Sequence, residues 1–288
     1  MQSLDVFQSL WAMERRHPTL AERSAAEHFA TIAAAGYTGI CLDPSVPEID
    51  DTVRLRPLFE RHGLQCMLNI FPATADELRP LLDLAAHMDA CLVNIIGGVM
   101  PLQVADAVPL AERWIAESRE YAFPVLFETH RDSLLNDLYY TLELLQRVPA
   151  MRLCADLSHF VVDREMRMPP RDADREYISA ILSRSDCLQG RVASREQVQV
   201  SIDFPQHREW VEQFKAWWLE GMRDWRHRNA DDARLVFLCE LGPPPYAITD
   251  ANGEELSNRW TEAATIRRWA EELWAESGRR PAADIARP

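Results

Sequence analysis

The feature that most constrains the fold is a regular alternation of short apolar runs with longer amphipathic stretches along all 288 residues. Each apolar run is too short and too continuously apolar to be a surface helix, and it fits a β-strand that is buried on both faces. The eight runs lie at residues 7–13, 39–42, 66–70, 91–96, 124–128, 153–156, 187–192 and 235–240.

The stretches between these runs have the apolar spacing of helices. Gly36 and Gly63 directly follow the first two stretches, as glycines often follow helices, and Thr74 with Glu77 forms a capping-box pattern before the third. The helices are expected at residues 20–35, 51–62, from 74 onward, 102–121, 133–147, 173–184, 206–228 and 258–277.

Strict alternation of strands and helices predicts a parallel sheet, and eight strands favour a closed barrel over an open sheet. We found no linker composition that would divide the chain. The sequence therefore predicts an α/β protein with one (β/α)₈ TIM-barrel domain over residues 1–288, in which 278–288 form a loose C-terminal tail.

Charge and hydropathy limit the possible partners. The net charge of −14 disfavours binding to nucleic acid or to an anionic membrane surface, since both require a cationic footprint. No apolar run reaches the length of a membrane span, and the N-terminus lacks the pattern of a signal peptide. The expected location is cytoplasmic, with the six cysteines reduced and mostly buried.

Three of the predicted strands end on an acid, namely Glu128, Asp156 and Glu240. In a parallel barrel the carboxyl ends of the strands form the active-site face, so these carboxylates are expected to meet there. Converging buried carboxylates repel one another, and a divalent cation is the simplest compensation. The alternative is that each acid caps a helix or pairs with an arginine.

Other polar residues stand near these acids. His130 and Arg131 follow Glu128, and His159 follows Asp156, which favours a functional cluster over isolated surface histidines. The seventh run offers Gln189 and Arg191; an internal salt bridge is the alternative role for this arginine. The three prolines before Tyr246 are expected to hold Glu240 and to place Tyr246 over the barrel mouth, or to be only a stiff connection.

Several of these segments resemble a known family. They are Gln-Ser-Leu-Trp-Ala-Met at 8–13, Glu-Thr-His-Arg at 128–131, Ala-Asp-Leu-Ser-His at 155–159, Gly-Arg-Val at 190–192 and Glu-Leu-Gly-Pro-Pro-Pro-Tyr at 240–246. In this order and spacing they resemble the xylose isomerase-like TIM-barrel superfamily, in its branch of sugar phosphate isomerases and epimerases. The resemblance covers nearly the whole chain.

The resemblance implies a divalent metal held by Glu128, Asp156 and Glu240, with Gln189 at the position where the family has a histidine ligand. An amide oxygen in place of imidazole favours Mg or Mn, while Zn remains possible. His159 and Arg191 match residues that contact substrate oxygens. Glu128 and Glu240 would move a proton on and off the carbon beside the substrate carbonyl.

The function implied is isomerisation or epimerisation of a sugar, sugar phosphate or related hydroxy-carbonyl compound through an enediolate that the metal stabilises. The partner would be a small carbohydrate-like substrate, and barrels of this superfamily often pair as homodimers. Two alternatives stay open: a metal-dependent lyase that dehydrates a keto-sugar or keto-cyclitol, and a metal-free barrel that only binds. Cleavage of damaged DNA is disfavoured because the chain has no basic face.

Overall fold

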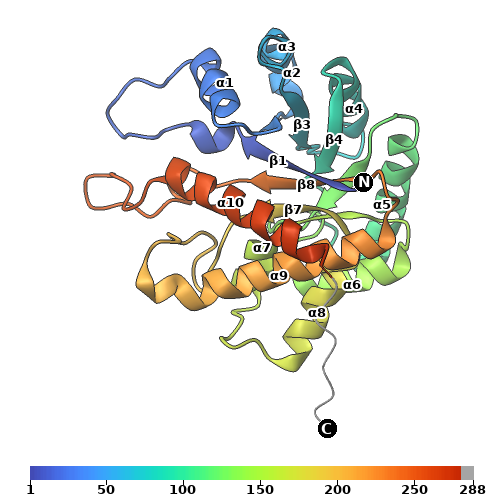
Figure 1. Ribbon diagram of the computed structural model, residues 1–288. Helices are drawn as coiled ribbons and strands as arrows, with labels where there is room; N and C mark the ends of the chain where they lie inside the picture. Colours follow the sequence, from blue (N-terminus) through green and yellow to red (C-terminus); the bar gives the residue numbers. More distant parts are fainter. Residues whose placement is uncertain (280–288) are drawn as a thin grey trace.

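The computed structural model describes residues 1–279, and its strands form a closed barrel in the order β1 to β8 (Figure 1). All eight neighbouring pairs are parallel, including β1 with β8. The predicted (β/α)₈ fold class is therefore confirmed. The strands are β1 Ser3–Ser9, β2 Gly39–Leu42, β3 Gln65–Ile70, β4 Ala90–Ile95, β5 Val125–Glu128, β6 Leu153–Ala155, β7 Ser185–Gly190 and β8 Arg234–Cys239.

The helices surround this barrel, and α9 and α10 run side by side across the face seen in Figure 1. Short 3₁₀ turns, η1 to η3, supplement them. The helices are α1 Ala25–Ala34, α2 Ile49–Val53, α3 Arg56–His62, α4 Leu78–His87, α5 Val104–Ser118, α6 Leu138–Arg147, α7 Leu157–Asp163, α8 Asp172–Leu182, α9 Arg208–Arg228 and α10 Arg259–Ser277; the turns are η1 Trp11–Met13, η2 Val46–Glu48 and η3 Pro205–His207.

The barrel interior contains an apolar layer beneath a polar one. Because side chains alternate along a strand, every second residue points inward. The apolar layer consists of Phe7, Cys41, Met67, Leu92, Leu126, Cys154, Cys187, Val236 and Leu238. On several strands the next inward position toward the carboxyl end is polar and buried, so the fold itself delivers polar side chains to one mouth of the barrel.

The first strand differs from its predicted span of 7–13. β1 ends at Ser9, and its pairing with β8 begins at Ser3. Trp11–Met13 instead form the turn η1, in which the Ser9 Oγ accepts a hydrogen bond from the Ala12 N–H at 3.3 Å. The apolar residues that extended the predicted strand therefore belong to a turn above the barrel mouth.

The helix predictions also need correction. The Thr74 and Glu77 capping box is wrong: α4 begins at Leu78, and the Glu77 carboxylate accepts a hydrogen bond from the Ala73 N–H in the preceding turn. The segment 51–62 divides between α2 and α3, and α7 was not predicted. Gly36 and Gly63 do have the left-handed backbone expected after a helix, with φ of 80° and 63°.

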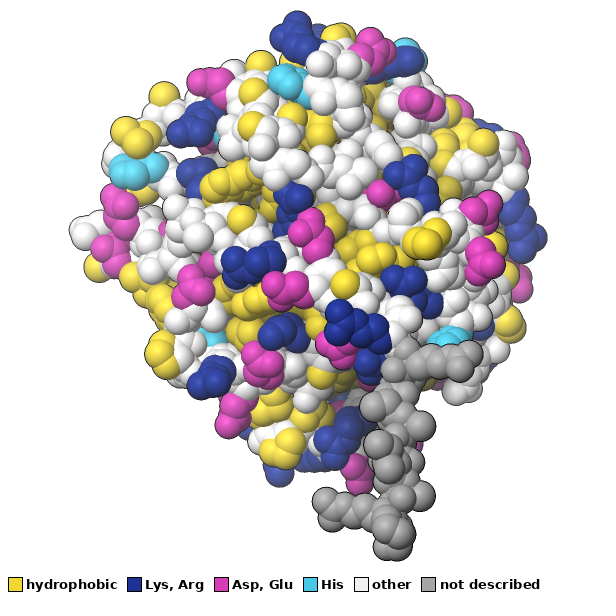
Figure 2. Space-filling model, in the orientation of Figure 1, with side chains coloured by type: hydrophobic (Ala, Val, Ile, Leu, Met, Phe, Trp, Pro, Cys, Tyr) yellow, Lys and Arg dark blue, Asp and Glu magenta, His cyan; other side chains and the backbone are white. Residues whose placement is uncertain are grey.

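Within residues 1–279, no helix is long and apolar enough to cross a membrane. Acidic and basic side chains are interspersed over the face shown in Figure 2. All six cysteines are free, and all are buried except Cys91, which is partly exposed. Most of the tail predicted at 278–288 lies outside the described residues.

Candidate active site

Three acids meet at the carboxyl-end mouth of the barrel. Glu128, Asp156 and Glu240 each stand two residues beyond an inward-facing apolar residue, which places their carboxylates above the apolar layer. All three are buried, and one oxygen of each lies within 4.8 Å of the other two. The structure thus brings together the three strand-end acids singled out in the sequence.

Asp156 also has a local structural role. It is the N-cap of α7, and its Oδ1 accepts a hydrogen bond from the Ser158 N–H at 2.9 Å. Its Oδ2 lies 2.6 Å from Nη1 of Arg191. Both structural alternatives for a strand-end acid, a helix cap and an arginine partner, are therefore present at Asp156.

Arg191 bridges two of the three acids. Besides its contact with Asp156, its Nη2 lies 2.9 Å from Oε2 of Glu240, and its Nε donates to the Glu240 carbonyl oxygen. The guanidinium is 1% exposed and lies 5.1 Å from the ring centre of Tyr246. One buried positive charge thus offsets part of the charge of Asp156 and Glu240.

Glu128 is left without such compensation. Its side chain is 1% exposed, and neither carboxylate oxygen has a hydrogen-bond partner among residues 1–279. Burial, and next the charge of Glu240, raise the pKa of Glu128 well above its ordinary value. A buried carboxylate in this position requires either a proton or a cation.

The pKa of Glu240 is raised to about 7. Burial is the largest cause, and the positive charge of Arg191 opposes it. A carboxyl group that changes protonation near neutral pH is suited to exchange a proton with a substrate. The environment of Glu240 therefore suits acid–base chemistry as well as coordination.

Two histidines, His130 and His159, lie beside the acids. The rings of His130 and His159 are 4.0 Å apart between centroids, and burial lowers the pKa of His130 to about 4. Burial also lowers the pKa of His159 well below its ordinary value, and its Nδ1 has no partner within residues 1–279. Together with Glu128, these histidines form a second group of possible metal ligands within 4.8 Å of one another.

Gln189 lies on β7, two residues beyond the inward-facing Cys187, so its side chain joins the polar layer. It is 1% exposed, and neither its amide oxygen nor its amide nitrogen has a partner in the described chain. Buried ligand atoms without protein partners, on Glu128, Gln189 and His159, are what a cation-binding site presents. The residues present therefore fit a divalent metal with mainly oxygen ligands.

Sequence reasoning missed a fourth acid and two asparagines. Asp43 directly follows β2, and Nδ2 of Asn69 lies 2.9 Å from Oδ1 of Asp43 and 3.3 Å from Oε1 of Glu240. Asn94 supports Asn69 with a hydrogen bond of 3.0 Å. The signal for Asp43 was present in the sequence, because it too is an acid that closes an apolar strand. Asn69 and Asn94 could be found only by knowing which residues of each strand point into the barrel.

A cavity of about 340 Å³ opens above the polar layer. This volume suits a small molecule. Tyr246 lines the cavity and packs edge-on to Trp11, with ring centres 5.3 Å apart. The Gln199 side-chain amide holds the loop, because it hydrogen-bonds both the N–H and the carbonyl of Gly242. The cavity is lined by Trp11, Asp43, Phe71, Ile96, Glu128, His130, Arg191, Glu240 and Tyr246.

Comparison with known proteins supports the fold. No protein-family model matches the chain. No curated protein matches it either. Among solved structures, D-allulose 3-epimerase from Methylomonas sp. in complex with D-allulose has a TM-score of 0.59 and 14% identity, covering 96% of this chain and 97% of that one. An L-ribulose 3-epimerase has a TM-score of 0.57 and 14% identity, covering 94% and 95%. These similarities support the closed (β/α)₈ barrel as the fold of this chain.

Proposed function

We propose that this protein is a metal-dependent epimerase or isomerase of a small sugar, sugar phosphate or related hydroxy-carbonyl compound. The observation that carries the proposal is the convergence of three buried strand-end carboxylates within 4.8 Å, one of which has no partner in the described chain. A cavity large enough for a small sugar lies directly above them. The fold is shared with two sugar 3-epimerases.

Glu128, Asp156 and Glu240 would hold the metal, with the Gln189 amide oxygen completing the set. Carboxylate and amide oxygens favour a hard ion such as Mg or Mn. When bound, such an ion supplies Lewis-acid stabilisation of negative charge on substrate oxygens.

The proton transfer is assigned to Glu128 and Glu240, which both line the cavity. An oxygen of one carboxylate takes the proton from the carbon beside the substrate carbonyl, which leaves an enediolate. For an epimerisation, the other carboxyl group returns a proton to the opposite face of that carbon. For an isomerisation, a proton is returned to the neighbouring carbon, and a second proton passes between the two enediolate oxygens. A pKa raised to about 7 suits Glu240 to this exchange near neutral pH, and burial raises the pKa of Glu128 as well.

Arg191 would hold the substrate, and His159 would position Arg191. The guanidinium of Arg191 lines the cavity and provides positive charge beside the developing enediolate. His159 is fully buried and does not line the cavity; its Nε2 lies 3.3 Å from Nη1 of Arg191, so its proposed role is to position that guanidinium. Trp11 and Tyr246 would cover the bound sugar and limit the access of water.

The test is exchange with heavy water. We expect protein supplied with Mn²⁺ or Mg²⁺ to incorporate deuterium beside the carbonyl of D-allulose or another ketose of a panel, with formation of the epimer or isomer, as measured by NMR. Loss of one water from the product, detected by mass, would instead identify a lyase. Absence of exchange with every ketose, with metal content confirmed, would contradict the proposal.

One observation favours a second candidate, a barrel that binds a ligand without metal. Arg191 already contacts both Asp156 and Glu240, so a side-chain cation stands between two of the proposed ligands. In that case no ion would compensate Glu128, whose pKa burial and the charge of Glu240 raise well above its ordinary value. Metal analysis of protein purified without chelator separates the two candidates.

A further inference from the structure

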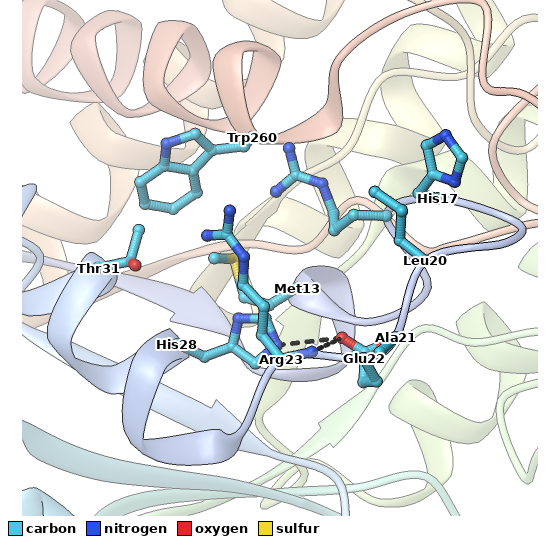
Figure 3. A pocket seen from close by; sticks show the side chains of 10 residues that line it. Met13, His17, Leu20, Ala21, Glu22, Arg23, His28, Thr31 and Trp260 are labelled. Atoms are coloured by element: carbon cyan, nitrogen blue, oxygen red, sulfur yellow. Dashed lines mark hydrogen bonds and ion pairs between the residues drawn. The ribbon is translucent and has the colours of Figure 1, made fainter.

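A second pocket, of about 370 Å³, lies outside the catalytic cavity, between the β1–α1 loop and the start of α10. Figure 3 shows Arg23, His28, Thr31 and Trp260 around its space. Met13 lines this pocket, whereas Trp11, two residues earlier on the turn η1, lines the catalytic cavity. The two hollows are therefore separated by one short turn.

The walls of this second pocket are fixed by Arg259, the first residue of α10. Its Nη2 donates to the carbonyl oxygens of Glu14 and Arg15, at 2.7 and 3.3 Å, and so ties the β1–α1 loop to the helix. The charge of Arg259 is itself neutralised by Glu255 at 2.8 Å. The pocket thus has a braced frame, and the cation that builds the frame is not free to bind a ligand.

Two other arginines are not neutralised in this way. Arg16 and Arg23 both line the pocket, and neither has an ion pair with a carboxylate within residues 1–279; Arg16 instead donates to the Asn258 side-chain oxygen at 2.8 Å. Burial, and next the charge of Arg259, lower the pKa of Arg16. An anion placed between the guanidinium groups of Arg16 and Arg23 would offset the positive charge around Arg16.

His28 adds an unpartnered group to the same wall. The residue is 4% exposed; its Nε2 lies 3.3 Å from Oε1 of Glu22, while its Nδ1 is buried with no partner in the described chain. Among residues 1–279, Glu22 is the one acid that lines the pocket, against Arg16 and Arg23. A chain with a net charge of −14 has therefore gathered an excess of positive charge around this hollow.

The pocket also has an apolar side. Met13 and the indole of Trp260 contribute to it, and Leu20 is 70% exposed beside them. A guanidinium pair matches the oxygens of a phosphate group, and an indole and a leucine match a flat apolar body. We propose that this pocket binds a small phosphate monoester with an apolar or aromatic body, at a site separate from the catalytic cavity.

The experiment is calorimetric titration with phenyl phosphate as the probe. We expect the wild-type protein to bind it and Arg23→Gln to bind at least about tenfold more weakly, because a charge-assisted hydrogen bond is lost. Arg23 is exposed, so this variant should fold; Arg16→Gln is the second variant and should show a similar loss. Arg61→Gln, which removes an arginine of α3 outside the pocket, is the matched control and should bind within about twofold of wild type.

Inorganic phosphate and Trp260→Leu test the apolar side of the pocket. Phenyl phosphate should bind more tightly than inorganic phosphate, and Trp260→Leu should weaken only phenyl phosphate. No binding to the wild-type protein would overturn the proposal. Equal binding by wild type, Arg23→Gln and Arg16→Gln would also overturn it, because the anion would then lie elsewhere, for example beside Arg191.

Discussion

Gln189 stands at the position where the sequence resemblance implies a histidine ligand, and it offers a direct test of the proposed metal site. We expect Gln189→His to raise the affinity for Zn²⁺ or Mn²⁺ by about tenfold or more, because imidazole is a stronger ligand than an amide oxygen. Gln189→Leu, which removes both donors, should weaken binding. Equal affinities of all three proteins in equilibrium dialysis would show that this side chain does not face the ion.

Glu128 and Asp156 should respond in opposite ways to loss of charge. Glu128 is buried without a partner in the described chain, so in chelator at pH 8 we expect Glu128→Gln to raise the free energy of unfolding by roughly 1–2 kcal/mol. Asp156→Asn keeps an oxygen that can cap α7, but it turns an amide NH₂ group toward Arg191; it therefore loses the buried ion pair and should cost about 3–5 kcal/mol.

Denaturant unfolding with and without Mn²⁺ measures both effects. Each variant should lose most of the stabilisation that the metal gives to the wild-type protein. A Glu128→Gln protein that is less stable than wild type in chelator would show that this carboxylate stabilises the fold through a partner or through packing.

At the level of secondary structure, the strands were more predictable than the segments directly after them. A strand that is buried on both faces shows in the sequence as an apolar run. Glu128, Asp156 and Glu240 each close such a run, so they could be predicted to lie together at one end of the barrel. Asp43 also closes an apolar run, but it was not predicted as a site residue. α7 was also missed, because its seven residues continue directly from β6 and only the cap at Asp156 marks the change.

Gly190 allows strand β7 to pack closely against Phe237 of β8 and Ile266 of α10. A Cβ on Gly190 would lie 2.6 Å from Phe237 and 2.7 Å from Ile266 of α10. We expect Gly190→Ala to destabilise the protein by about 1–3 kcal/mol and to weaken metal binding, since it would displace Gln189 and Arg191.

The matched control is Gly278→Ala, at the end of α10. A Cβ there meets nothing closer than 3.7 Å, and the residue has an ordinary negative φ of −81°. Its free energy of unfolding should stay within about 0.5 kcal/mol of wild type. Similar losses for both glycine variants would contradict the packing argument for β7.

For the whole molecule, the strand–helix alternation was enough to predict the barrel, because a parallel sheet of eight strands has few ways to bury both faces. It was not enough to predict the contacts of Arg191 with two acids, or the pocket that joins Arg16 to Trp260 across the chain. Such contacts depend on loop paths and side-chain reach, which spacing in the sequence does not encode.

The buried acids should make the stability of the metal-free protein depend on pH. Glu240 has a pKa raised to about 7 in the folded state, so its contribution is fully present below the unfolded pKa of about 4.5 and is lost as pH rises through 7. We expect the free energy of unfolding in chelator to fall by roughly 3 kcal/mol over this range. Mn²⁺ should remove most of this fall, because it binds the deprotonated carboxylates.

The central claim is that carboxylates from separate βα units share one cation. Anomalous diffraction at the manganese edge, from crystals grown with Mn²⁺, tests it most directly. We predict one peak at roughly 2.0–2.2 Å from oxygens of Glu128, Asp156 and Glu240, with the Arg191 guanidinium moved away from at least one acid. A map without a peak at the barrel mouth, in which Arg191 still bridges Asp156 and Glu240, would contradict the claim.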